Sequence, residues 1–316
     1  MTGASGRQLF GDRVAQAVTA RESQLVLGLD PDPERLWPGA LDLVGAGEAE
    51  DALDGPRECA ARAVAAHCAL VIEAVAEECV AVKPQVACFE RLGAPGWAAL
   101  EQVVTRAQDH GLLVIADAKR GDFDVTAAVY AQAFFGETPT PFGPVRGLGA
   151  DALTVNPLLG ADSVAPFVKR GREHGGGLFV LARTSNPGAF DVQGLELAGG
   201  GTVSERLAAL IAEAGREGVG VAGLTDVGAV VGATAPEWVA KLRALLPRAI
   251  FLLPGVGAQG GTVEALAPAF APGPAGGLIA ASRWIVAAHE RRGGEPADAA
   301  RAEAAALRET AWRLAA

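Results

Sequence analysis

Eight short apolar runs, most of them ending in polar residues, alternate along the chain with longer alanine-rich amphipathic segments. A short apolar run between helical segments is typical of a buried parallel strand. The runs are Leu25–Asp30, Cys79–Lys83, Leu112–Asp117, Ala152–Asn156, Leu178–Arg183, Val227–Ala233, Ile250–Pro254 and Gly277–Ala281. Eight such units in 316 residues, with no linker between them, favour a (β/α)8 TIM barrel over a doubly wound sheet. We therefore expect a single α/β domain over residues 1–316.

The segments between the runs predict the helices of the barrel. Examples are Ala60–Glu77, Trp97–His110, Thr126–Phe135, Val203–Arg216 and Pro236–Leu246. Two longer stretches, Leu36–Gly55 and Gly136–Gly149, are interpreted as irregular insertions, and Pro296–Ala316 predicts an extra C-terminal helix.

Charge and cysteine content limit the class of protein. The net charge of −10 argues against a nucleic-acid or anionic-membrane partner, although a local basic pocket for a small anion stays compatible with it. The four cysteines show no C-x-x-C pair and no metal-ligand spacing, so we interpret them as buried thiols of a reducing compartment. Met1–Arg21 is polar and no apolar run approaches ~18 residues, so we expect a cytoplasmic protein without signal peptide or membrane span.

Polar side chains stand where the predicted strands end. Asp30 ends the first run, Lys83 the second, and Asp117 and Lys119 the third, while Asn156 ends the fourth. The active site of a (β/α)8 barrel lies at the carboxyl ends of its strands, whereas residues at strand starts serve stability. The pattern therefore favours a functional site over a purely structural one, although Asn156 is as compatible with a structural hydrogen bond.

The hexapeptide Asp117–Asp122 contains an acid, a base and a second acid around one small space. If the third run is a regular strand, Asp117 and Lys119 point to the same side and Asp122 falls in the turn beyond. Only four of the 27 basic residues are lysines, so a lysine here suggests chemistry that needs an ammonium able to give up a proton, as guanidinium cannot. An isolated D-x-K triplet would more often be a surface salt bridge.

A glycine-rich segment, Pro254–Gly261, follows the seventh run, and Ser282-Arg283 follows the eighth. The loops after strands seven and eight form the usual phosphate site of these barrels, where backbone N–H groups and a helix N-terminus face the anion. Arg283 can add a bidentate contact and Gln259 an amide donor. A flexible turn with a surface arginine is the alternative, but the two segments together predict a phosphate cup whose loop could close over a ligand.

Six blocks of the chain, in this order, resemble the orotidine 5′-phosphate decarboxylase family, in its longer bacterial branch. They are Gly28-Leu29-Asp30, Val82-Lys83-Pro84-Gln85, Asp117–Asp122, Ser185-Asn186-Pro187-Gly188, Pro254–Gly261 and Ser282-Arg283. The resemblance implies conversion of orotidine 5′-monophosphate to uridine 5′-monophosphate and carbon dioxide, the last step of pyrimidine nucleotide synthesis, without metal or organic cofactor. It also implies a homodimer with active sites at the interface.

The same resemblance implies a role for each matching residue. Lys83, Asp117, Lys119 and Asp122 would form an alternating charge chain, with Asp122 reaching into the partner subunit's site. Substrate-binding residues would be Asp30 and Lys83 for the ribose, together with the partner subunit's Thr126, then Ser185 for the pyrimidine, and Pro254, Gln259, Ser282 and Arg283 towards the phosphate.

The residues suit that chemistry independently. Loss of carbon dioxide leaves negative charge on a ring carbon without an adjacent π acceptor, so fixed electrostatics must stabilise that charge before it is protonated. Lys119 could do both, and flanking carboxylates would keep it protonated. Asp117 beside the substrate carboxylate would disfavour the bound ground state, and binding energy from the remote phosphate would offset that repulsion.

Two other functions remain open at this stage. A metal-dependent sugar-phosphate enzyme of the same barrel superfamily would have an acid, which helps to hold magnesium, where this chain has Lys83. A non-catalytic phosphate-ligand sensor is disfavoured because both acids around Lys119 are present.

The four histidines, which lie in helical or loop contexts, are expected to be structural: His67, His110, His174 and His289.

Overall fold

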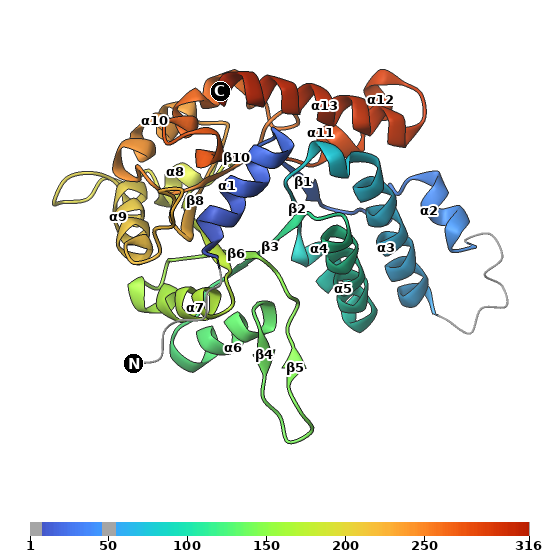
Figure 1. The fold of residues 1–316 in the computed structure, drawn as a ribbon, viewed down its shortest axis with the longest axis horizontal. Coiled ribbons are helices and arrows are strands. Elements are labelled where there is room, and N and C mark those ends of the chain that lie inside the picture. Colours follow the sequence, from blue (N-terminus) through green and yellow to red (C-terminus); the bar gives the residue numbers. More distant parts are fainter. Residues whose placement is uncertain (1–7, 46–54, 316) are drawn as a thin grey trace.

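The computed structural model describes residues 8–45 and 55–315, and eight parallel strands close a barrel within them (Figure 1). The barrel strands are β1 (Leu25–Leu29), β2 (Ala81–Pro84), β3 (Leu113–Arg120), β6 (Ala152–Val155), β7 (Gly177–Arg183), β8 (Val227–Val231), β9 (Phe251–Pro254) and β10 (Gly277–Ala281). Their order around the barrel is β1-β10-β9-β8-β7-β6-β3-β2. All eight predicted runs are strands, so the predicted (β/α)8 fold is confirmed.

Helices surround the barrel and cover one of its ends (Figure 1). The α-helices are α1 (Phe10–Arg21), α2 (Pro38–Leu43), α3 (Pro56–Val75), α4 (Val86–Glu90), α5 (Gly93–Asp109), α6 (Asp124–Phe134), α7 (Ala161–Glu173), α8 (Ala189–Val192), α9 (Val203–Gly215), α10 (Pro236–Leu245), α11 (Arg283–Val286), α12 (Ala288–Arg292) and α13 (Pro296–Ala315). Short 3-10 helices lie at η2 (Ala76–Glu78), η3 (Glu264–Phe270) and η4 (Pro274–Gly276). The predicted C-terminal helix is α13, which packs on α3, α11 and α12.

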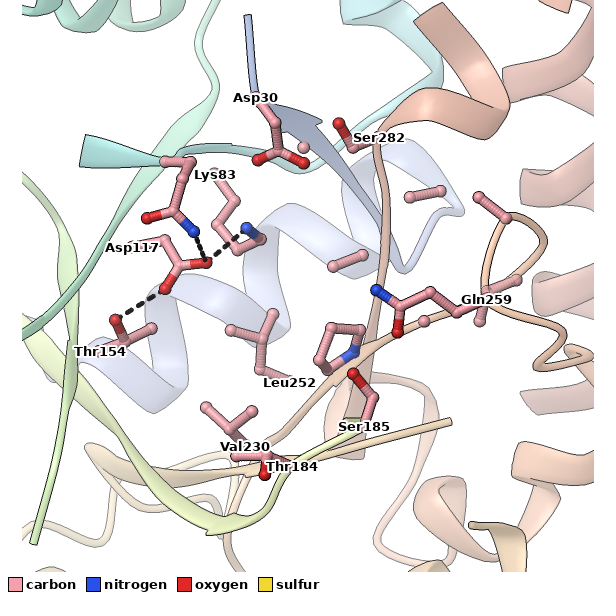
Figure 2. A pocket seen from close by; sticks show the side chains of 18 of the residues that line it. Asp30, Lys83, Asp117, Thr154, Thr184, Ser185, Val230, Leu252, Gln259 and Ser282 are labelled. Carbon is pink, nitrogen blue, oxygen red and sulfur yellow. Dashed lines mark hydrogen bonds and ion pairs between the residues drawn. The ribbon is translucent and has the colours of Figure 1, made fainter. Parts of the chain in front are cut away.

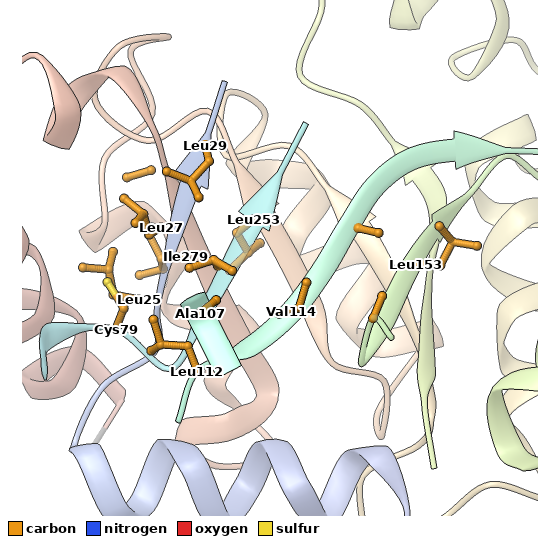
Figure 3. Close-up of a cluster of buried hydrophobic side chains, with 14 of the residues drawn as sticks. Leu25, Leu27, Leu29, Cys79, Ala107, Leu112, Val114, Leu153, Leu253 and Ile279 are labelled. Carbon is orange, nitrogen blue, oxygen red and sulfur yellow. The ribbon is translucent and has the colours of Figure 1, made fainter. Parts of the chain in front are cut away.

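Apolar side chains fill both faces of the sheet. Leu25, Leu27 and Leu29 of β1 point outward into a cluster with Ile279, Leu253 and Val114 (Figure 3). Val26, between them, belongs to a second cluster inside the barrel. Burial on both faces explains why each strand reads as a continuous apolar run rather than an alternating one.

Helix α1 closes the amino end of the barrel, although the polar composition of Met1–Arg21 did not predict a helix. Its residues Phe10, Val14 and Val18 are buried in the interior cluster, and Phe10 packs edge-on against Phe179 at 5.9 Å between ring centroids. Phe10 also lies against Gly177, the first residue of β7. The carboxyl ends of the strands are thus left as the open end.

Both predicted irregular insertions contain regular structure, contrary to expectation. Leu36–Gly55 includes α2, and residues 46–54 of it lie outside the described residues. Gly136–Gly149 forms an antiparallel hairpin of β4 (Glu137–Thr138) and β5 (Val145–Arg146), which extends away from the barrel (Figure 1). These strands are too short to show an alternating pattern in the sequence.

One helix and the cysteines bear on two of the expectations drawn from the sequence. Helix α3 with η2, Pro56–Glu78, is long and apolar enough to cross a membrane by length and composition. However, 61% of its most apolar window is buried, as in a core helix, so this segment is not evidence for a membrane span. None of the four cysteines forms a disulfide within the described residues, but only Cys68 and Cys79 are buried as expected, while Cys59 and Cys88 are partly exposed. Burial raises the pKa of the Cys68 thiol, with smaller contributions from Cys88 and Asp30, so that side chain remains neutral.

Candidate active site

A pocket of about 360 Å³ opens at the carboxyl end of the barrel. Its apolar floor is made by Leu181, Val230 and Leu252. Figure 2 shows Lys83, Asp117 and Thr154 on one side of it and Gln259 and Ser282 on the other. The lining contains three cationic side chains, Lys83, Lys119 and Arg283, beside the acids Asp30 and Asp117. A local group of basic side chains, with which the net charge of −10 was compatible, is therefore present in this pocket.

Asp117 is the centre of a charged network. Its Oδ2 atom accepts a hydrogen bond from Lys83 Nζ at 2.6 Å, and its Oδ1 atom accepts one from Lys119 Nζ at 2.6 Å. The side chains of Lys83 and Asp117 are 9% and 8% exposed, whereas that of Lys119 is 45% exposed. Both lysines line the pocket, with Lys83 the more buried of the two and Lys119 the more open to an incoming ligand.

Mutual attraction keeps this network charged despite its burial. Burial by itself would raise the pKa of Asp117, but Lys83 and Lys119 hold that pKa well below its usual range. Burial would likewise lower the pKa of Lys83, but Asp117 and Asp30 outweigh it and raise that pKa above the ordinary lysine value. Asp117 is therefore a carboxylate, and Lys83 an ammonium, across the neutral pH range.

The strand around Lys119 is irregular, although the sequence predicted a regular β-strand there. The pairing of β3 with β6 shifts register between Ala116 and Arg120, and Lys119 has a φ of 48°, in the left-handed region. A non-glycine residue in this region is strained, and such strain gathers at functional sites. The predicted meeting of Asp117 and Lys119 is correct, but a bulge rather than strand alternation brings it about.

Thr154 stabilises the bulge and was missed in the sequence. Its Oγ1 atom donates to Asp117 Oδ1 at 2.9 Å and accepts from the backbone N–H of Lys119 at 2.9 Å. Gln85, for which no role was predicted, also contacts Asp117. Its Nε2 atom donates to Asp117 Oδ2 at 3.3 Å. The one available signal for Thr154 was a hydroxyl inside the otherwise apolar run Ala152–Val155.

The network makes a testable contribution to stability. Asp117→Asn leaves Lys83 buried without its charged partner. We therefore expect the free energy of unfolding, measured in urea at pH 7, to be about 3 kcal/mol lower than that of wild type. The Asp117 carboxylate contributes its full stability above the pKa of an aspartate in the unfolded chain, which is near 4. This contribution is lost as the pH falls towards the lower pKa of Asp117 in the folded protein. The difference between variant and wild type should therefore narrow on acidification below about pH 4. Asp109→Asn, at an exposed carboxylate of α5, is the control; an equal effect of both substitutions would contradict the argument.

The predicted phosphate cup lies across the pocket from Asp117. Gly255, Gly257 and Gly260 have φ values of 103°, 74° and 90°, which side chains rarely adopt, so only glycine permits this loop without strain. Gly28 of β1 has no room for a Cβ atom, because it would lie 2.7 Å from Cβ of Ser282, and this close packing brings β1 against the segment that carries Arg283. The helix that follows, α11, has only four residues, so an anion in this cup would meet backbone N–H groups and Arg283 rather than a strong helix dipole.

A third segment, the loop after β7, forms the remaining wall. Gln193 holds its first residue: Gln193 Oε1 accepts from the backbone N–H of Thr184 at 2.9 Å, and Gln193 Nε2 donates to Thr184 Oγ1 at 3.0 Å. Thr234 Oγ1 donates to the carbonyl of Ser185 at 3.1 Å. Ser185 is thereby presented to the pocket, as predicted, while Gln193 and Thr234 had no signal in the sequence.

Most of the predicted site residues line this one pocket, and two do not. Those in the lining are Asp30, Lys83, Asp117, Lys119, Ser185, Pro254, Gln259, Ser282 and Arg283. Asp122 and Thr126 lie outside it: the Asp122 carboxylate accepts from the backbone N–H of Phe123, and Thr126 is exposed on α6.

Two residues without an assigned site role have structural contacts. Asn156 lies outside the pocket lining, and its Oδ1 atom accepts from the backbone N–H of Leu158. His67 accepts a hydrogen bond from the backbone N–H of Trp37, and burial lowers its pKa to about 4. Both therefore support local backbone structure, in agreement with the structural interpretation of His67.

Comparisons with known proteins give a consistent match to this fold and pocket. The profile described as "Orotidine 5′-phosphate decarboxylase / HUMPS family" matches residues 23–295. A curated orotidine 5′-phosphate decarboxylase of Deinococcus radiodurans is 42% identical, over 95% of this chain and 96% of its own. One from Rhodopirellula baltica is 39% identical over 89% of each chain. A solved structure from Streptomyces avermitilis, assigned to the same enzyme, is 34% identical, with a TM-score of 0.71 over 100% of this chain and 96% of that one.

Proposed function

Because the chain belongs to the orotidine 5′-phosphate decarboxylase / HUMPS family, we propose that its pocket holds orotidine 5′-monophosphate with the carboxylate beside Asp117 and Lys119. The reaction is decarboxylation to uridine 5′-monophosphate in pyrimidine biosynthesis, and the enzyme is a carboxy-lyase. The observation that carries the proposed arrangement is the buried Lys83–Asp117–Lys119 network facing a glycine-lined cup across one pocket.

Lys119 is the proposed proton donor. Its ammonium is half exposed to the pocket and held by Asp117, so it can stabilise charge that develops on the ring carbon and then protonate that carbon. The C–CO₂ bond breaks with its electron pair left on carbon, and the proton from Lys119 forms the new C–H bond. Asp117 keeps its negative charge and therefore repels the substrate carboxylate, a repulsion that ends when carbon dioxide leaves.

The remaining lining residues are proposed to bind the nucleotide. Gln259 and Arg283, with the backbone at Ser282, bind the phosphate; Asp30 and Lys83 hold ribose hydroxyls; and Ser185 faces the pyrimidine. Phosphate binding at a distance from the reacting carbon supplies energy that offsets the repulsion by Asp117.

A homodimer with shared sites is part of the proposal. Asp122 and Thr126 lie outside the pocket of their own subunit, on the segment made of α6 and the turn that precedes it. Phe123, Val125 and Val129 on the same segment are 60%, 69% and 57% exposed. An exposed apolar group of this kind is typical of an interface. In a two-fold dimer this segment would reach across to the other site, with Asp122 supplementing the charge network.

We also propose a cytoplasmic location, since the enzyme belongs to a biosynthetic pathway of the cell interior.

The test of the function is the loss of orotidylate absorbance on adding purified protein, with and without a chelator. We expect uridine 5′-monophosphate and carbon dioxide in equal amounts and no effect of the chelator. Both Asp117 oxygens already accept hydrogen bonds from ammonium groups, which would repel a divalent metal. Activity that a chelator abolishes and magnesium restores would indicate a metal-dependent relative instead. Binding without turnover would indicate a sensor.

Arg283→Ala should weaken phosphate binding more than chemistry. A hydrogen bond to a charged group contributes about 1.5–3 kcal/mol, so we expect the Kd for uridine 5′-monophosphate to rise by roughly 10- to 100-fold. Isothermal titration calorimetry measures this directly. Arg301→Ala, at an exposed ion pair on α13, is the control, and equal affinity in the two variants would remove Arg283 from the phosphate site.

A further inference from the structure

The loop of the phosphate cup rests on one aromatic side chain. A Cβ atom built on Gly257 would lie 2.5 Å from the Trp284 ring, so the loop backbone is in direct contact with the indole. Trp284 is also the residue after Arg283, in the short helix α11. Any movement of this ring would therefore displace both the loop that carries Gln259 and the arginine of the cup.

Trp284 is in turn fixed by a carboxylate from the C-terminal helix. Its Nε1 atom donates to Glu303 Oε1 at 2.6 Å, and Glu303 is only 7% exposed. The other oxygen, Oε2, accepts from Arg292 Nε at 2.7 Å. Arg291 lies over the indole at 3.8 Å from its centroid and donates to the Trp284 carbonyl at 2.6 Å. Arg291 also forms an ion pair with Glu303 Oε2 at 3.4 Å, so the buried carboxylate is satisfied by three partners, has one favourable position and sets the orientation of the ring.

Helix α13 lies outside the (β/α)8 units, yet it packs along α11 and α12 (Figure 1). Glu303 does not line the pocket and cannot touch the substrate. Its hydrogen bond to Trp284 Nε1 links it to the residue that follows Arg283 and supports the loop. We infer that Glu303 is a positioning residue, which through Trp284 holds the Gly255–Gly261 loop and Arg283 in the geometry that binds phosphate. This inference rests on the proposed function of the cup.

The test compares two substrates that differ only in the phosphate. With orotidine 5′-monophosphate, Glu303→Ala should lower kcat/KM about 10-fold, the loss expected when one hydrogen bond to a charged group no longer orders the cup. With orotidine, the nucleoside without phosphate, kcat/KM should change less than about twofold, because the cup is then empty. Arg283→Ala should show the same selective loss, and Glu309→Ala, at an exposed carboxylate of the same helix, should show none.

Two further variants separate positioning from general damage to the fold. Trp284→Phe keeps a ring against Gly257 and removes the indole N–H, and it should reproduce the selective loss. Glu303→Gln keeps an oxygen that can accept from the indole, and it should recover at least part of the activity. In the Arg283→Ala background, Glu303→Ala should cost clearly less than in wild type, since both act on the same phosphate contact.

An equal loss of kcat/KM for both substrates, or no loss for either, would overturn the positioning role of Glu303. If Glu303→Ala does not fold, as judged by its thermal unfolding, Trp284→Phe and Glu303→Gln decide the question by the same comparison. Failure of the wild-type enzyme to turn over orotidine 5′-monophosphate would instead refute the proposed function, so the two failures are distinguishable.

Discussion

Replacing Lys119 with alanine is expected to lower kcat by about 10⁴-fold or more while nucleotide binding persists. The substitution removes the proposed proton donor, a role that contributes roughly 10²–10⁴-fold in rate. It also removes the ammonium that would stabilise developing charge, a contribution of roughly 10²–10³-fold. The proposed phosphate cup is unchanged, so the Kd for uridine 5′-monophosphate should stay within about threefold of wild type. Stopped or continuous assays of orotidylate absorbance measure the first quantity, and calorimetry measures the second.

Lys119→Arg separates charge from proton transfer. Guanidinium retains the positive charge but does not release a proton at neutral pH, so this variant should remain at least about 10²-fold slower than wild type. Lys169→Ala, at an exposed lysine of α7, is the control for loss of a lysine outside the site. Turnover by Lys119→Ala within about tenfold of wild type would remove Lys119 from the chemistry.

Asp122→Ala is expected to lose roughly 10²–10³-fold in kcat, although Asp122 does not line the pocket of its own subunit. The decisive step is to mix it with Lys119→Ala under conditions that exchange subunits. Each heterodimer then contains one site with both defects and one with neither. Random pairing should restore about a quarter of wild-type activity, since half of the dimers carry one intact site of two.

The matched control for this mixture is Lys83→Ala with Lys119→Ala. Lys83 and Lys119 contact the same Asp117, so both defects always fall on residues of home sites and no intact site can form. This mixture should stay inactive. Recovery in the control, or none in the Asp122 mixture, would contradict an interface role for Asp122.

The barrel and its open end followed from local patterns. Continuous apolar runs predict strands buried on both faces, and parallel strands bring their carboxyl ends together, so Asp30, Lys83 and Asp117 were predicted to converge from their positions alone. Pro254, Gln259 and Arg283 were placed by the same argument, combined with the glycines that a tight anion-binding loop requires.

Features that depend on tertiary contacts were not predictable in this way. The left-handed conformation of Lys119 is stabilised by Thr154 on the neighbouring strand, a contact across 35 positions of the chain. Helix α1 has no continuous apolar run, and it is stabilised by Phe10, Val14 and Val18, the three large side chains that it buries against the barrel interior. Glu303 resembles any other helical glutamate in the sequence; only the packing of α13 on α11 brings it to Trp284.

The central claim is that Lys119, held by Asp117, protonates the carbon that loses carbon dioxide. The most direct measurement is the reaction of orotidine 5′-monophosphate, ¹³C-labelled in its carboxylate, in deuterated water with a chelator present, for wild type and Lys119→Ala side by side. For wild type we predict one labelled carbon dioxide for each uridine 5′-monophosphate, with one deuterium on the carbon that carried the carboxylate. Lys119→Ala should bind the nucleotide and form almost no product. Comparable product formation by the variant, or a wild type that needs added metal, would contradict the claim.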